Sequence, residues 1–184
     1  ASIEKLAHPA TVDALVKAAD VLAGRRRIFS IGSRATYPVA FLFAYTQSYF
    51  WDRAVLLEGP GGTATDPLRR AGPDDGLLAV SLSPYAASTH EAVEIAAAAG
   101  VAVVAITDSD SAPIARSAHA VIRVNPRSPS FFDAISPALA AAEMLVALIA
   151  SRVGASVPDA VQERERQFRE SGVFVPEIRR QPLT

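Results

Sequence analysis

Short, continuously apolar runs recur along the chain, and stretches with helical character separate most of them. The runs are rich in β-branched residues, and most do not alternate between apolar and polar positions. Strands that are buried on both faces of a parallel sheet have this pattern. We therefore predict five strands, at residues 27–31, 54–57, 77–81, 101–107 and 120–124.

Helices are predicted between most of these strands and after the last one. They span residues 11–23, 37–50, 66–71, 88–99, one or two turns within 111–118, 131–153 and 158–170. Thr11 is expected to cap the first helix, Gly24 to end it, and Asp66 to cap a helix with proline in its first turn. Pro137 lies inside the long apolar helix, so either Ser136 caps a new helix there or the helix kinks.

This alternation of strands and helices predicts an α/β fold with right-handed crossovers. Five strands suggest three layers, α/β/α, around a parallel sheet in the flavodoxin-like order 2-1-3-4-5. Residues 1–155 are expected to form this domain, and residues 156–184 a charged helix with an extended tail. Such a tail is weakly stable alone, so we expect it to lie against its own domain or a partner subunit.

Composition narrows the class of protein. The chain has no cysteine, which excludes disulfides, thiolate metal sites and a cysteine nucleophile and fits a cytoplasmic protein. Its formal net charge of -1 provides no overall basic field for nucleic acid. We interpret the arginines at 25–27 as the solvated end of a helix rather than as a nucleic-acid patch. The apolar stretch 137–150 is too short for a membrane span and contains Glu143, so no membrane partner is expected.

Two hydroxyl-rich loops follow the first and third predicted strands, at 32–36 and 81–89. In this strand order, ligands bind at the carboxyl ends of the strands, between these two loops. Each loop leads into a helix N-terminus, which offers unpaired N–H groups, and the guanidinium of Arg34 can make two parallel hydrogen bonds to a phosphate. The two loops together therefore indicate an anion-binding pocket. The candidate ligand-binding residues are Gly32, Ser33, Arg34, Thr36, Ser81, Ser83, Tyr85 and Ser88. In the alternative interpretation, Thr36 and Ser88 only cap helices, and the serines at 81 and 83 only bond to the backbone.

The same loops carry a family resemblance. The chain resembles a SIS (sugar isomerase) domain over roughly residues 10–155, in the branch attached to RpiR-type transcription regulators. The family's first loop reads Gly-x-Gly-x-Ser, against 32–36 here, and its second reads Ser-x-Ser-Gly-x-Thr, against 81–86. Residues 105–115 resemble its fourth strand and following turn, and 128–133 the loop before its final helix. The resemblance implies a SIS fold, a sugar-phosphate ligand and a homodimer or higher homo-oligomer.

Three residues depart from the family pattern. Arg34 and Pro84 replace glycines, and Ala86 replaces the threonine that would bind phosphate. The second loop therefore offers fewer groups that can bind phosphate, while Arg34 adds a positive charge from the first loop. We therefore expect an anionic ligand that is held differently, and the alternative is a site that binds no ligand.

No residue matches a motif for sugar-phosphate isomerisation, which needs a histidine or carboxylate over the sugar carbons. His8 and His119 are expected at the surface, and His90 on the solvated side of a helix. A dehydrogenase is disfavoured because no Gly-x-Gly-x-x-Gly follows the first strand. We predict an effector-sensing, sugar-phosphate-binding and dimerisation domain with no catalytic residue, metal or cofactor. The alternatives are an aldose–ketose phosphate isomerase and a ligand-free dimerisation module.

The chain starts at Ala1 rather than at a methionine, so we expect it to be part of a longer protein. RpiR-type regulators carry a helix-turn-helix domain ahead of the domain that this chain resembles. The resemblance therefore implies that DNA is a partner only through an N-terminal domain that is absent from this sequence.

Overall fold

Five parallel strands form one sheet in the order β2-β1-β3-β4-β5 in the computed structural model, which describes residues 3–175. The strands are β1 (Ile28–Gly32), β2 (Ala54–Leu56), β3 (Gly76–Val80), β4 (Ala102–Thr107) and β5 (Ala120–Arg123). Ile28 of β1, an interior strand, pairs with Ala54 on one side and with Gly76 on the other. The predicted fold class and strand order are confirmed, and each strand end lies within one residue of its predicted position.

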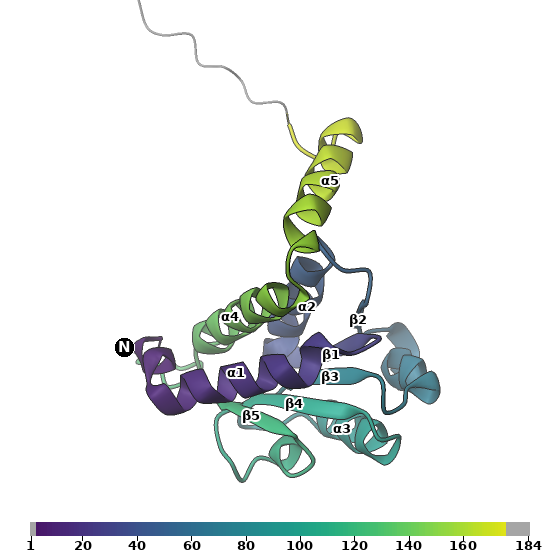
Figure 1. Ribbon diagram of the computed structural model, residues 1–184. Helices are drawn as coiled ribbons and strands as arrows, with labels where there is room; N and C mark the ends of the chain where they lie inside the picture. Colours follow the sequence, from purple (N-terminus) through teal and green to yellow (C-terminus); the bar gives the residue numbers. More distant parts are fainter. Residues whose placement is uncertain (1–2, 176–184) are drawn as a thin grey trace, which may run out of the picture.

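Helices cover both faces of the sheet (Figure 1). One face carries α1 (Pro9–Ala23), α2 (Tyr37–Gln47) and α4 (Ser136–Val153), and the other carries α3 (Ala87–Ala98) with the 3-10 segments η3 (Pro60–Arg70) and η4 (Pro113–Ala115). Successive residues of a strand point to opposite faces. Leu78 therefore joins the core under α1 and α4, while its neighbour Leu77 joins the core under α3. Covering both faces is what requires the strands to be apolar throughout.

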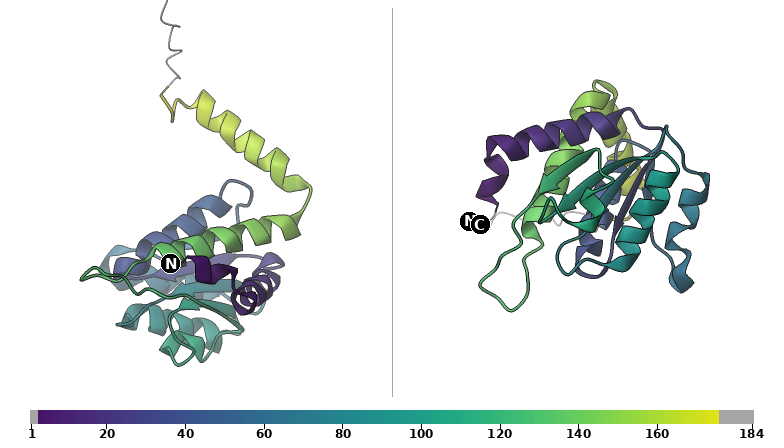
Figure 2. Two further views of the ribbon diagram at one scale, coloured as in Figure 1. Left: turned by 90° about the vertical axis from the view of Figure 1, so that its left-hand side faces the viewer. Right: turned by 90° about the horizontal axis from the view of Figure 1, so that it is seen from below.

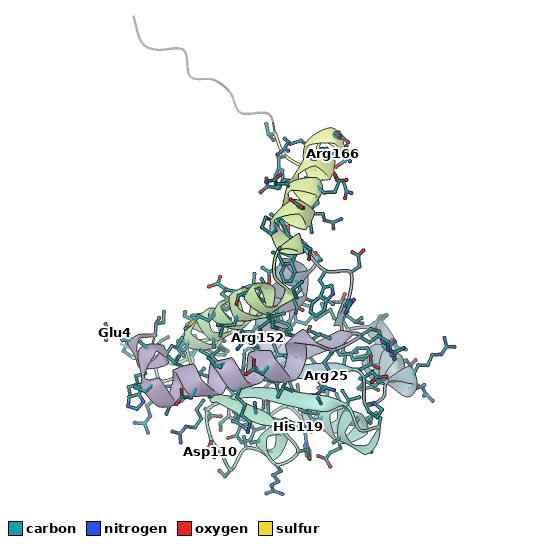
Figure 3. The ribbon with its side chains drawn as sticks, viewed as in Figure 1. Glu4, Arg25, Asp110, His119, Arg152 and Arg166 are labelled. Atoms are coloured by element: carbon teal, nitrogen blue, oxygen red, sulfur yellow. The ribbon has the colours of Figure 1, made fainter. Side chains whose placement is uncertain are left out.

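The apolar helix α4 is long enough to cross a membrane by length and composition alone. In the structure, however, one of its sides packs into the core against α1 and α2. The side chains on this buried side are Ala138, Ala141, Ala142, Leu145 and Ile149. Near its C-terminus, Arg152 Nε lies 2.5 Å from Asp20 Oδ1 of α1, and Figure 3 labels Arg152 at this junction. The opposite side exposes Glu143 to solvent. These contacts are those of a core helix of this domain.

The beginnings of three helices differ from the predictions. α1 begins at Pro9, and His8 rather than Thr11 occupies the capping position, because proline suits the first helical turn. The predicted helix from residue 131 begins only at Ser136. Of the two alternatives for Pro137, a new helix does start there, although Ile135 rather than Ser136 occupies the capping position, and the kink within a longer helix is wrong. Residues 124–135 form an irregular loop instead. The short helix predicted from residue 66 is the second part of η3, whose glycines at 61 and 62 interrupt the helical backbone.

Two further helices end close to their predicted positions. α2 ends at Gln47 rather than at residue 50, because the following N–H groups bond in turns to carbonyls of residues 44–47. α3 ends at Ala98, and Gly100 takes the left-handed conformation with φ of 75° that commonly ends a helix.

The last helix, α5 (Ser156–Glu170), extends away from the body of the domain (Figures 1 and 2). It has no buried residue, and its ion pairs, including those of Arg166, lie far from the sheet (Figure 3). Its Phe168 ring contacts the Tyr49 ring beyond the end of α2, with centroids 5.6 Å apart. The charged helix is thus confirmed and touches its own domain here. The tail predicted beyond it lies mostly outside the described residues, and the division at residue 155 stays a prediction.

Two arginines of the basic cluster form an ion pair at the amino ends of β1 and β3. Asp75 Oδ2 lies 2.8 Å from Arg26 and 2.9 Å from Arg27, and the Asp75 side chain is wholly buried. The Gly72 N–H also donates to Asp75, at 3.1 Å. Burial alone would raise the pKa of Asp75, but the hydrogen bonds from Arg27, Arg26 and Gly72 outweigh it and lower that pKa to about 2. The cluster therefore stabilises the sheet at the end opposite the predicted site.

Candidate functional site

A cavity of about 650 Å³ lies at the carboxyl ends of β1 and β3, where the strand order reverses. β1 continues into the 3-10 turn η2 (Arg34–Thr36) and α2, while β3 continues through residues 81–86 into α3. The cavity is lined by Ser33, Arg34, Ala35, Thr36, Ser81, Leu82, Ser83, Pro84, Ala86, Phe131, Phe132, Asp133 and Ile135. Its volume is in the range of small-molecule sites, and it lies where doubly wound sheets bind their ligands.

The β1 loop turns so tightly that its first position requires glycine. A Cβ on Gly32 would lie 2.4 Å from the backbone carbonyl oxygen of Thr36. Two residues later, Arg34 has a φ of 57°, in the left-handed region that glycine enters easily and other residues rarely adopt. The chain thus keeps the backbone of a glycine where it carries an arginine. The Arg34 side chain is exposed, and within residues 3–175 it forms no ion pair.

Hydroxyl groups, of which Ser33 and Thr36 line the cavity, join the two loops. The Thr36 hydroxyl lies 2.9 Å from the carbonyl oxygen of Val80 and 3.0 Å from that of Ser33. The Ser33 and Ser88 hydroxyls are 2.8 Å apart, and the buried Thr89 hydroxyl donates to Ser33 Oγ at 3.0 Å. This network ties the β1 loop to the end of β3 and to the first turn of α3.

The β3 loop is stabilised by Asp108, at the end of β4. Asp108 Oδ1 accepts from the Ser83 N–H at 3.3 Å, and the Ala86 N–H donates to Ser81 Oγ at the same distance. Burial, followed by the charge and hydrogen bond of Asp108, raises the pKa of Tyr85. Tyr85 packs against the core on the α3 side. Asp108 therefore positions this loop from outside the cavity lining.

Five of the eight predicted binding residues line the cavity, and the other three, Gly32, Tyr85 and Ser88, do not. Helix capping does not account for Thr36 or Ser88. Thr36 occupies the capping position of α2 but its hydroxyl makes no capping bond, and Ser88 lies within α3. Ser81 does bond to the backbone, as the alternative interpretation expects. The part of each residue in ligand binding stays a prediction.

Sequence reasoning missed residues that reach the site from distant segments. Thr89 belongs to the hydroxyl-rich run 81–89 and contributes the buried hydroxyl of the network. Phe131, Phe132 and Asp133 line the cavity from the loop before α4, within the run 128–133 that resembles a SIS-domain loop. The aromatic and acidic side chains in this run were the only local sign in the sequence that it could contribute to a binding site. Their position beside β1 depends on the path of the loop, which no local pattern indicates.

The lining carries one cation, Arg34, and one carboxylate, Asp133. No histidine belongs to it: His8 and His119 are exposed, and His90 is half-buried in α3. The buried Nδ1 of His90 has no hydrogen-bond partner among the described residues. The cavity can therefore attract an anion through Arg34 and the positive ends of α2 and α3.

A larger cavity, of about 900 Å³, lies between the N-terminal segment η1 (Glu4–Ala7) and the end of β5. Its lining includes Lys5, Asp108 and Arg123, but it contains neither hydroxyl-rich loop. It also lies away from the β1–β3 reversal, so the smaller cavity is the better candidate for the ligand site.

A parallel sheet with hydroxyl-rich loops at its reversal is the architecture of small-molecule-binding α/β domains. Comparison with known protein families identifies the family of this domain. The SIS domain family matches residues 21–148, so the chain belongs to this family. The family resemblance seen in the sequence is therefore confirmed. No curated protein matches the chain.

Solved structures with this fold include transcription regulators and proteins with an inferred isomerase function. The sugar isomerase domain of an RpiR transcription factor from Sphaerobacter thermophilus is 26% identical, with a TM-score of 0.79 over 90% of this chain and 94% of that one. NanR from Vibrio vulnificus, complexed with ManNAc-6P, is 19% identical, with a TM-score of 0.78 over 92% of this chain and 65% of that one. A Methanococcus jannaschii protein, with an inferred function of 3-hexulose-6-phosphate isomerase, is 15% identical, with a TM-score of 0.71 over 88% of this chain and 90% of that one.

Proposed function

We propose that this chain is the effector-sensing domain of an RpiR-type transcription regulator and binds a sugar phosphate in the cavity between β1 and β3. The observation that carries the proposal is the convergence of Arg34 and the N-termini of α2 and α3 on one hydroxyl-lined cavity. The similarity to the RpiR domain from Sphaerobacter thermophilus and the ManNAc-6P bound to NanR support it.

In this proposal the two loops recognise different parts of the ligand. Arg34 and the backbone N–H groups at the start of α3 bind the phosphate, whereas at the start of α2 the Tyr37 N–H already donates to the Arg34 carbonyl and Pro38 has none. The Ser81 and Ser83 hydroxyls bond to sugar hydroxyls. A ligand that bridges both loops favours the arrangement of subunits in which the loops are correctly spaced, and control requires that the affinity differ between arrangements.

A titration of the purified chain against a panel of sugar phosphates tests the proposal. Calorimetry should detect binding of at least one member, and Arg34→Ala should weaken that ligand by roughly 5- to 150-fold, the scale of a charged hydrogen bond. Arg116→Ala is the matched control, because Arg116 is exposed and lies outside the cavity lining. No binding by the folded protein would contradict the ligand proposal, and an unchanged affinity of Arg34→Ala would place that residue outside the site.

The proposal extends to partners. An exposed ladder of rings on α2, formed by Tyr37, Phe41 and Tyr45 and continued by Tyr49, supports a homodimer or higher homo-oligomer, because exposed apolar patches mark interfaces. DNA would be bound only by a helix-turn-helix domain ahead of this one, and the protein would act in the cytoplasm. Multi-angle light scattering should show at least a dimer, and Phe41→Arg should reduce the mass to that of a monomer.

An isomerase is the second candidate, because the lining contains the carboxylate of Asp133 and the fold is shared with the Methanococcus jannaschii protein. A carboxylate over the sugar carbons can act as the base of isomerisation. A coupled assay with aldose and ketose phosphates separates the two functions. Turnover that Asp133→Asn abolishes would establish the isomerase and contradict the sensor.

A further inference from the structure

Two exposed phenylalanines, Phe131 and Phe132, line the cavity between β1 and β3. Phe131 is 101% exposed and Phe132 is 57% exposed, yet both line the cavity. Their rings are 6.2 Å apart at an interplanar angle of 65°. Other lining residues are mainly hydroxyl-bearing or small, so these rings are the aromatic surface that the cavity offers a ligand.

The rings are carried by a loop that is closed at its base and hydrogen-bonded only locally toward its tip. The Ala134 N–H donates to the Pro126 carbonyl at 2.8 Å, which joins the two ends of the loop. Between them, the Ser130 N–H donates to Ser128 Oγ at 3.1 Å. Among the described residues, 128–133 make hydrogen bonds only with one another. In the right-hand view of Figure 2 this green loop, which follows β5, stands out from the body of the domain.

Such a loop can move as a unit over the cavity, because its base is already closed and residues 128–133 have no hydrogen bond to other described parts of the domain that would have to break. Closing it would bring an aromatic face over a ligand that the hydroxyl network and Arg34 hold from the other side. Aromatic rings in sites stack on apolar faces of comparable area. A closed sugar ring presents such a face of C–H groups, while its hydroxyls point outward to polar partners.

We propose that Phe131 and Phe132 select ligands with a closed sugar ring, by stacking on the C–H face of a cyclic sugar phosphate. This inference rests on the proposed function and specifies its ligand class. An open-chain polyol phosphate has the same phosphate and hydroxyls but no rigid apolar face. It therefore bonds to the two loops and gains nothing from the phenylalanines.

Calorimetry on the full chain tests this with three kinds of probe: glucose 6-phosphate and N-acetylmannosamine 6-phosphate as cyclic ligands, sorbitol 6-phosphate as the open-chain ligand, and inorganic phosphate. Phe132→Ala, and the double variant with Phe131→Ala, should weaken a cyclic ligand by about 3- to 10-fold, the scale of one aromatic contact. Both should leave sorbitol 6-phosphate and phosphate within about twofold. Phe132→Tyr should restore the affinity, because it keeps the ring.

Phe174→Ala is the matched control, because Phe174 is 59% exposed and lies outside the cavity lining. The exposed rings contribute little to stability, so circular dichroism and thermal melting should show folded variants. Hydrogen exchange at residues 126–134 should slow when a cyclic ligand binds, as an independent measure of loop closure.

The outcomes separate this inference from the proposed function. If no phosphorylated probe binds the wild-type chain, both are overturned. If cyclic and open-chain probes bind and the variants weaken them equally or not at all, only the ring selection is overturned. A lower mass of the double variant in light scattering, with ligand affinity unchanged, would instead assign the two rings to a protein interface and would also overturn it.

Discussion

Replacing Asp75 by asparagine should destabilise the domain by about 2–3 kcal/mol at neutral pH. The fall of the Asp75 pKa from its ordinary 3.8 to about 2 corresponds to about 2 kcal/mol of interaction with the ionised carboxylate. Removing one member of a buried ion pair typically costs about 3–5 kcal/mol. We expect a cost at or below the lower end of this range, because the Arg26 and Arg27 side chains are 59% and 29% exposed and can turn toward water when the carboxylate is lost.

The pH dependence of this effect has a definite sign. A carboxyl whose pKa is lowered by folding binds fewer protons in the native state, so its contribution is complete above its unfolded-state pKa near 4. The contribution is lost progressively as the pH falls from about 4 toward 2. The stability difference between wild type and Asp75→Asn should therefore be largest at pH 7 and shrink through this window.

Urea unfolding followed by circular dichroism, repeated at several pH values, measures both quantities. Asp74→Asn is the matched control: Asp74 is exposed, and its replacement should change the unfolding free energy by less than about 0.5 kcal/mol. A difference below about 0.5 kcal/mol for Asp75→Asn at pH 7, or one that is constant down to pH 2, would refute the assignment of this ion pair as a stabilising element.

Two further substitutions test the loops. Gly32→Ala should reduce sugar-phosphate affinity by more than about tenfold in calorimetry, because the new Cβ would lie 2.4 Å from the Thr36 carbonyl oxygen and displace the β1 loop. The control Gly24→Ala should leave the affinity unchanged, because no heavy atom lies within 4 Å of its new Cβ. Equal effects of the two substitutions would contradict the steric argument. Asp108→Asn should loosen the β3 loop and lower sugar-phosphate affinity a few-fold. It should also return the pKa of Tyr85 toward 10, as read from ultraviolet titration. An unchanged affinity would show that Asp108 does not position the loop.

The sheet was predictable because its signal is local. Five apolar runs, each short and rich in β-branched residues, mark strands covered on both faces, and the alternation with helices leaves few topologies. The position of the β1 and β3 loops follows from that topology. Ser33 and Ser81 could thus be placed together from the sequence, although they are far apart in the chain.

Helix starts and the outer wall of the cavity were not predictable in the same way. His8 and Thr11 compete for the first helical turn, and the choice depends on Pro9 and on the packing of η1. The segment 131–135 reads as the start of an apolar helix, and only its place beside the β1 and β3 loops shows that it lines the cavity. Tyr85 belongs to the predicted loop but turns toward α3, which depends on Asp108 from another strand.

Ser33, Ser88 and Thr89 form a chain of three hydroxyls, and the two hydrogen bonds between them use only two of its three hydroxyl hydrogens. Thr89 donates to Ser33, and the bond between Ser33 and Ser88 can run in either direction. If Ser33 donates, the remaining hydrogen is on Ser88; if Ser88 donates, it is on Ser33, the member of the pair that lines the cavity. An anion in the cavity favours the second order and a ligand hydroxyl that donates favours the first. Reversing one bond, with no movement of the backbone, thus lets Ser33 meet either an anion or a hydroxyl donor in the cavity.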